Sequence, residues 1–190
     1  MKPLKKTSQI ALIVCSLLLI VAYFVPVWRI DLWAPQYPEG LSMGIWLSKL
    51  SGQVDIINGL NHYIGMAIIK EEMFPEFKIL PYAVGIIIVL GVLTGMLKNR
   101  KMLVFFLTIL IISGVIAMYD FWSWGFEYGH NLSNDAAIKV PGMAYQPPLI
   151  GYKELLNFGA YSIPDIGGWL FVLLGVVTVS TLLYEVKYNK

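Results

Sequence analysis

The sequence predicts an all-α membrane protein, a four-transmembrane-helix bundle with a periplasmic cap built from two long loops. Of the 190 residues, 57% are hydrophobic and only 14% are charged, whereas an average soluble domain is about 25% charged. Four charge-free segments approach or reach the roughly 20 apolar residues that a helix needs to cross a bilayer core. These segments are residues 10–27, 79–97, 102–119 and 166–184. The composition therefore favours a single integral membrane domain, residues 1–190.

The four segments are connected in ways that support this bundle. The first segment follows a basic stretch, and we interpret it as an uncleaved signal anchor because bulky residues, 23–28, follow it instead of a small-residue cleavage site. The second and third segments are joined by residues 98–101 alone, a turn short enough to require two antiparallel helices. The other two connections, residues 28–78 and 120–165, are long.

The distribution of Lys and Arg predicts the orientation. Eight of the 14 basic residues lie in the short segments 1–9, 98–101 and 185–190, while the two long loops hold six basic residues among 11 acids. Short segments rich in Lys and Arg stay on the cytoplasmic side. We therefore expect a multi-pass membrane protein with both termini cytoplasmic and both long loops, 28–78 and 120–165, outside.

The predicted spans offer little chemistry. They contain no charged residue and no histidine, whereas transporters and proton pumps place ionisable groups inside the membrane. Gly91 and Gly95 form a small-residue pair that suits either a homo-oligomer interface or close packing within the bundle. No catalytic residues are predicted, since no nucleophile–base pair, phosphate-binding loop or Cys-x-x-Cys motif is present. The net charge of +2 gives no basic patch for nucleic acid.

The long loops are rich in aromatic residues and poor in charge, which favours a folded cap over disorder. Alternating residues 29–33 predict a short strand. We expect short helices over residues 42–50 and 152–158, and a longer helix over residues 55–73 that Pro75 ends.

The expected helix over residues 55–73 carries the candidate metal ligands. At about 100° per residue, His62, Met66 and Met73 share a stripe opposite an apolar sector. Imidazole nitrogen and thioether sulfur suit Cu(I), and His130 or Met143 from the second loop would complete such a site. The alternative is that these residues pack inside the cap. Four further residues are expected to contact a protein partner: Trp33, Tyr37, Asn58 and Asn61.

Two stretches of the first loop, residues 32–41 and 58–66, together with the four-span layout, resemble the small NosB-like membrane proteins. The resemblance implies a bacterial inner membrane and the neighbourhood of nitrous oxide reductase and its copper-maturation factors in denitrification. We therefore expect a non-enzymatic accessory protein that supports assembly, copper supply or electron delivery for a periplasmic respiratory enzyme. Its expected partners are the lipid bilayer and a membrane or periplasmic protein. The alternatives are a transport subunit for a copper species or small solute, and a structural subunit of a respiratory complex.

Overall fold

The computed structural model describes residues 3–155 and 157–188 and shows a mixed α/β protein, so the all-α prediction is wrong. Five α-helices and a five-stranded antiparallel sheet are present within these residues. In chain order the elements are α1 (Lys6–Leu18), η1 (Leu19–Tyr23), β1 (Trp28–Ala34), β2 (Tyr37–Ile45), β3 (Leu50–Gly52), α2 (Val54–Tyr63), η2 (Glu71–Met73), η3 (Pro75–Lys78), α3 (Leu80–Leu97), α4 (Arg100–His130), β4 (Gly151–Leu155), β5 (Phe158–Pro164) and α5 (Ile166–Tyr188).

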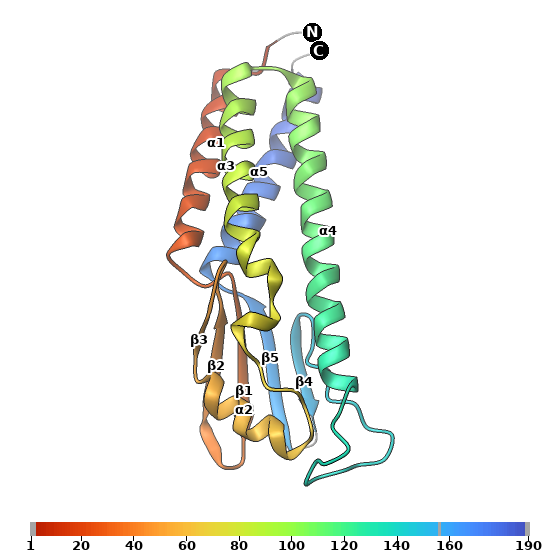
Figure 1. Cartoon of the computed structure of the whole chain (residues 1–190). Coiled ribbons are helices and arrows are strands. Elements are labelled where there is room, and N and C mark those ends of the chain that lie inside the picture. Colours follow the sequence, from red (N-terminus) through yellow and green to blue (C-terminus); the bar gives the residue numbers. More distant parts are fainter. Residues whose placement is uncertain (1–2, 156, 189–190) are drawn as a thin grey trace.

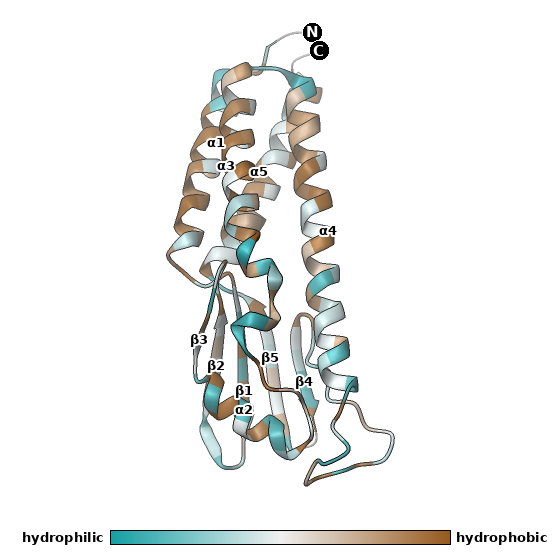
Figure 2. Ribbon diagram, in the orientation of Figure 1, coloured by the Kyte–Doolittle hydropathy of each residue, from teal (hydrophilic) through white to brown (hydrophobic). Residues whose placement is uncertain are grey.

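Four helices form an elongated bundle at one end of the molecule, and both termini lie at its tip (Figure 1). Helix α1 with η1, and helices α3, α4 and α5, are each long and apolar enough to cross a membrane, and their hydrophobic residues cover the bundle (Figure 2). Gly91 and Gly95 of α3 face α1, where a Cβ atom would lie 2.1 Å from Ser16 Oγ and 2.6 Å from Ile13 Cγ1. The small-residue pair thus serves packing of α3 against α1 within the chain.

A buried carboxylate ties the two terminal helices together at the tip of the bundle. Glu185 of α5 is 1% exposed. Its Oε1 accepts hydrogen bonds from Ser8 Oγ at 2.5 Å and from the backbone N–H of Lys5 at 2.9 Å. A buried carboxyl group is costly unless it is hydrogen-bonded, so these donors hold the start of α1 against the end of α5.

The other end of the molecule is a sheet domain made from both long loops (Figure 1). Its strand order is β3-β2-β1-β5-β4, and β1 is antiparallel to both neighbours, with Ile30 opposite Met43 on β2 and Ser162 on β5. Two inner strands, β1 and β5, are continuous with the bundle, because β1 follows η1 and β5 leads into α5. The backbone N–H of Gly167 donates to Pro26 O at 2.9 Å, which fixes the sheet to the ends of these helices.

The sheet corrects three of the local predictions. The expected strand 29–33 is confirmed as part of β1. The helix expected over residues 42–50 is absent, because residues 42–45 belong to β2 and Leu50 begins β3, and in the segment 152–158 residues 152–155 belong to β4 and Phe158 begins β5. The helix expected over residues 55–73 ends at Tyr63. β2 and β4 form strands because each pairs with a neighbouring strand of the sheet, and local capping signals do not reveal this pairing.

Helix α4 continues well past the predicted span. Its 31 residues extend about 46 Å at 1.5 Å per residue, whereas a bilayer core is about 30 Å thick. The part after residue 119 runs beside the sheet (Figure 1). There, Phe121 packs edge-on against Trp28 of β1, with ring centroids 5.2 Å apart, and Trp124 lies 5.2 Å from Phe74. The last third of α4 is therefore a structural part of the sheet domain.

Candidate functional site

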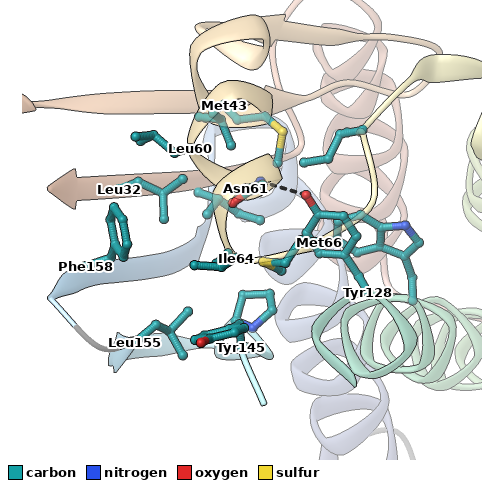
Figure 3. Close-up of a pocket in the computed structure, with 15 residues that line it drawn as sticks. Leu32, Met43, Leu60, Asn61, Ile64, Met66, Tyr128, Tyr145, Leu155 and Phe158 are labelled. Carbon is teal, nitrogen blue, oxygen red and sulfur yellow. Dashed lines mark hydrogen bonds between the residues drawn. The ribbon is translucent and has the colours of Figure 1, made fainter. Parts of the chain in front are cut away.

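The sheet domain contains a partly open cavity of about 60 Å³. It lies between the inner face of the sheet, helix α2 with the segment that follows it, the end of α4, and residues 143–149, which we name the strap (Figure 3). The sheet contributes Ile30 and Leu32 of β1, which alternate with the solvent-facing Arg29–Asp31 ion pair. This period of two directs one apolar row of β1 to the cavity.

Asn58 fixes the wall that follows α2. Its Nδ2 donates to Ile69 O at 2.9 Å, and the N–H of Ile69 donates to Asn58 Oδ1 at 2.7 Å. The side-chain amide therefore pairs with the backbone as a neighbouring strand would. Gly65, at φ +80°, makes the turn that lets the chain leave α2 and return along it. As a result Ile64, Met66 and Ile69 are buried.

Helix α4 contributes a bonded polar pair. Tyr128 stacks on Trp124, with ring centroids 4.8 Å apart, and its hydroxyl oxygen accepts a 2.7 Å hydrogen bond from Asn61 Nδ2 (Figure 3). Burial raises the pKa of Tyr128, and the hydrogen bond from Asn61 opposes this rise less strongly. The phenol is therefore uncharged at neutral pH.

The strap forms one wall of the cavity and is held at three points. The N–H of Tyr145 donates to Gly129 O at 2.8 Å, Gln146 O accepts from Lys153 Nζ at 3.0 Å, and Leu149 O accepts from Ser162 Oγ at 3.1 Å. Gly129 permits this close approach, because a Cβ there would lie 2.3 Å from the Cα of Gln146.

Tyr145 is the unusual residue of the site. It is 1% exposed, and its hydroxyl has no hydrogen-bond partner among the described residues. Figure 3 shows the hydroxyl directed toward Leu155, another residue of the cavity wall. A buried polar group without a partner costs about 1–3 kcal/mol. Tyr145 thus places a buried, unpartnered hydroxyl within the apolar wall of the cavity.

The four predicted metal ligands lie in different environments. Met66 is buried and lines the cavity, whereas His62, Met73 and His130 are exposed. The ring of His130 stacks on Phe126 at 4.0 Å, and its Nδ1 lies 2.8 Å from Phe126 O. His62 and Met66 do not share a helical stripe, because α2 ends between them at Tyr63.

The other donors add little to a metal site. No cluster of three or more His, Cys, Asp or Glu suited to a metal occurs among the described residues. Met143 is half-buried and packs against the core of the sheet domain. Met43, which the sequence did not single out, lines the cavity as a second thioether beside Met66.

The four residues predicted to contact a protein partner also lie in different environments. Asn58 and Asn61 bond internally as described, Tyr37 is half-buried, and Trp33 is exposed on the sheet. Sequence reasoning missed Tyr128 and Tyr145.

The helical spacing of residues 121, 124 and 128 could have indicated Tyr128, whereas the proline-rich surroundings of Tyr145 give no periodic signal.

Comparisons of the chain with protein-family models, curated proteins and solved structures found no match.

Proposed function

We propose that this protein is a non-enzymatic accessory protein of a bacterial inner membrane that acts through its sheet domain on the periplasmic side. The basic residues near the span ends support cytoplasmic termini. The resemblance to NosB-like proteins supports an exported copper enzyme, such as nitrous oxide reductase, as the client. The protein would aid the assembly, copper supply or electron delivery of that enzyme.

One observation carries the proposal: the helix bundle that would lie in the membrane and the sheet domain that holds the candidate site are separate parts of the molecule. The predicted spans, residues 10–27, 79–97, 102–119 and 166–184, hold no charged or histidine side chain, so they offer no relay for a transported ion. The cavity, the unused hydroxyl of Tyr145 and the exposed aromatic Trp33 all belong to the sheet domain. Because β1 and β5 continue into α1 and α5, the bundle holds this domain at a fixed height above the bilayer.

A deletion strain tests the function directly. Loss of the protein should lower the activity and copper content of the client enzyme, and the wild-type gene should restore both. Trp33→Ala should restore them less well, because it removes a 41% exposed ring from the sheet. Tyr82→Ala, which removes a 76% exposed ring at the start of α3, is the matched control and should restore them fully. Normal levels of active, metallated client in the deletion strain would count decisively against the proposal.

The orientation has its own test. With Cys15 replaced by Ala, a single cysteine is placed at the exposed Ser48 or Ser133 of the sheet domain, or at Asn99 between α3 and α4. A membrane-impermeant maleimide applied to intact spheroplasts should label the first two positions and spare the third. The opposite pattern would place the sheet domain in the cytoplasm and remove any periplasmic role.

A further inference from the structure

We propose that the hydrocarbon tail of a membrane lipid lies between α4 and the rest of the helix bundle, in the half of the membrane next to the sheet domain. The inference goes beyond the accessory function and does not rest on it, because it concerns only how the bundle meets the bilayer.

Helix α4 is buried against the rest of the chain near its two ends but not between them. Near its start, Phe106 is buried in the bundle core and Leu110 packs against that core. Near its end, Phe121 and Tyr128 pack in the core of the sheet domain. Residues 111–120, all of which the structure describes, include no buried residue, and eight of these ten are exposed. At about 100° per residue the exposed positions point in every direction around the helix, so the side facing the bundle is accessible too.

Small residues widen this gap on the bundle side. The inward-facing residues of α4 recur every three or four positions, from Phe106 and Leu110 at one end to Phe121 at the other. Between them the same row contains Gly114 and Ala117, which are both exposed. A Cβ atom at Gly114 would have no atom of another segment within 4 Å. Figure 1 shows α4 running apart from α3 and α5 along this stretch.

The length of the gap indicates what fits it. Leu110 and Phe121 are eleven positions apart, which is about 16 Å at 1.5 Å per residue. This is about half of the roughly 30 Å thickness of a bilayer core. A transmembrane helix of a partner needs the whole thickness, so it would have to break the packing of Phe106 and Leu110. A lipid tail spans only one leaflet, so the gap matches a tail in length.

The lining disfavours water and an empty space. Residues 111–118 offer Ser113 as their only polar side chain, whereas a buried water needs two to four polar partners. An empty gap would forfeit the dispersion contacts of its lining. Lipid tails are as apolar as leucine and surround the outer side of α4 in the membrane. A tail therefore fills the gap without any cost of transfer from water.

Methyl groups report on the content of the gap. The full-length protein, deuterated except for ¹³C-labelled methyl groups of alanine and isoleucine, is placed in nanodiscs of protonated dimyristoylphosphatidylcholine. Nuclear Overhauser effects (NOEs) from the methylene protons of the tails to the protein methyl groups are then measured. Ala117 reports on the gap. Ile116, 62% exposed on the opposite side of α4, reports on the outer surface, and Ala22, 0% exposed, reports on the packed bundle core.

We expect tail NOEs of similar intensity at Ala117 and Ile116 and none at Ala22. Gly114→Phe should fill the gap, so the tail NOE at Ala117 should be lost while that at Ile116 remains. Val115→Phe is the matched control, because it adds a ring one position further along, at a residue that is 64% exposed. This control should keep both NOEs.

Two results would overturn the proposal. If Ala117 of the wild type shows NOEs only to water or to α3 and α5, water fills the gap or the helices close it. If Gly114→Phe keeps the full tail NOE at Ala117, the tail lies outside the gap. The first result comes from the wild type and does not depend on a variant that folds. A deletion strain without a phenotype would remove the accessory function and leave both results unchanged.

Discussion

Replacing Gly129 with Ala sets helix propensity against packing of the strap. In an isolated helix the change stabilises by about 0.5–1 kcal/mol, because alanine loses less backbone entropy than glycine. Here the new Cβ would lie 2.3 Å from both the N and the Cα of Gln146 and 2.7 Å from the carbonyl carbon of Tyr145. These are backbone atoms, so the strap has to move as a whole.

The cost of this movement can be estimated from the contacts that it breaks. The hydrogen bond from the N–H of Tyr145 to Gly129 O is worth about 1 kcal/mol. Displacing the buried Tyr145 ring adds a large part of the roughly 3–5 kcal/mol that removal of a core aromatic costs. After the gain in helix propensity, we expect a net destabilisation of the strap by about 2–4 kcal/mol.

Hydrogen exchange of the strap amides measures this quantity. A loss of about 2–4 kcal/mol corresponds to exchange faster by about thirtyfold to several hundredfold. Gly59→Ala is the matched control, because Gly59 is also a helical glycine of the sheet domain but has no atom within 4 Å of an added Cβ. It should leave strap exchange unchanged and stabilise α2 by up to about 1 kcal/mol. Unchanged strap exchange in Gly129→Ala would refute the reasoning.

Three further predictions concern other parts of the fold. Asn58→Ala leaves the backbone N–H and C=O of Ile69 without partners, so it should lower the free energy of unfolding of the sheet domain by about 2–4 kcal/mol. Denaturant titration followed by tryptophan fluorescence measures this change, and a loss below about 1 kcal/mol would contradict the prediction. Ser8→Ala removes a donor to the buried Glu185 carboxylate and should cost the bundle about 1.5–3 kcal/mol; an unchanged thermal unfolding curve would show that the bond contributes nothing. Because the pKa of Tyr128 is raised above its ordinary 10.0, the unfolded chain loses this proton first, so stability should fall as the pH rises above about 10; circular dichroism across this range should show a smaller fall in Tyr128→Phe.

The helices of the bundle were predictable because the signal is local. Four charge-free apolar segments were predicted to be spans, and they correspond to the four long apolar helices. The segments are residues 10–27, 79–97, 102–119 and 166–184. The true end of α4 was missed for a physical reason. The predicted span ended before Asp120, the first charge, but a charge ends the membrane-embedded part of a helix and not the helix itself.

The sheet and its cavity were less accessible. β1 was predicted from its own alternation, but its partner β5 lies about 130 residues later, and pairing at that distance leaves no mark on either segment. Gly65 is the signal that could have corrected the helix over residues 55–73, because a glycine shortly after a helical stretch is typical of a helix end. The cavity depends on four segments meeting in space, so neither its volume nor the orphaned Tyr145 hydroxyl could be predicted.

The position of β1 between β2 and β5 sets an order of events during synthesis. The ribosome produces residues 28–52 early, so β1, β2 and β3 can pair at once. The second edge of β1 stays open until β5 is made, after α3 and α4. An open edge invites pairing with other chains, and charged side chains on the strand discourage it. Arg29 and Asp31 supply such charges. We therefore expect this pair to discourage pairing of β1 with other chains until β5 has been made.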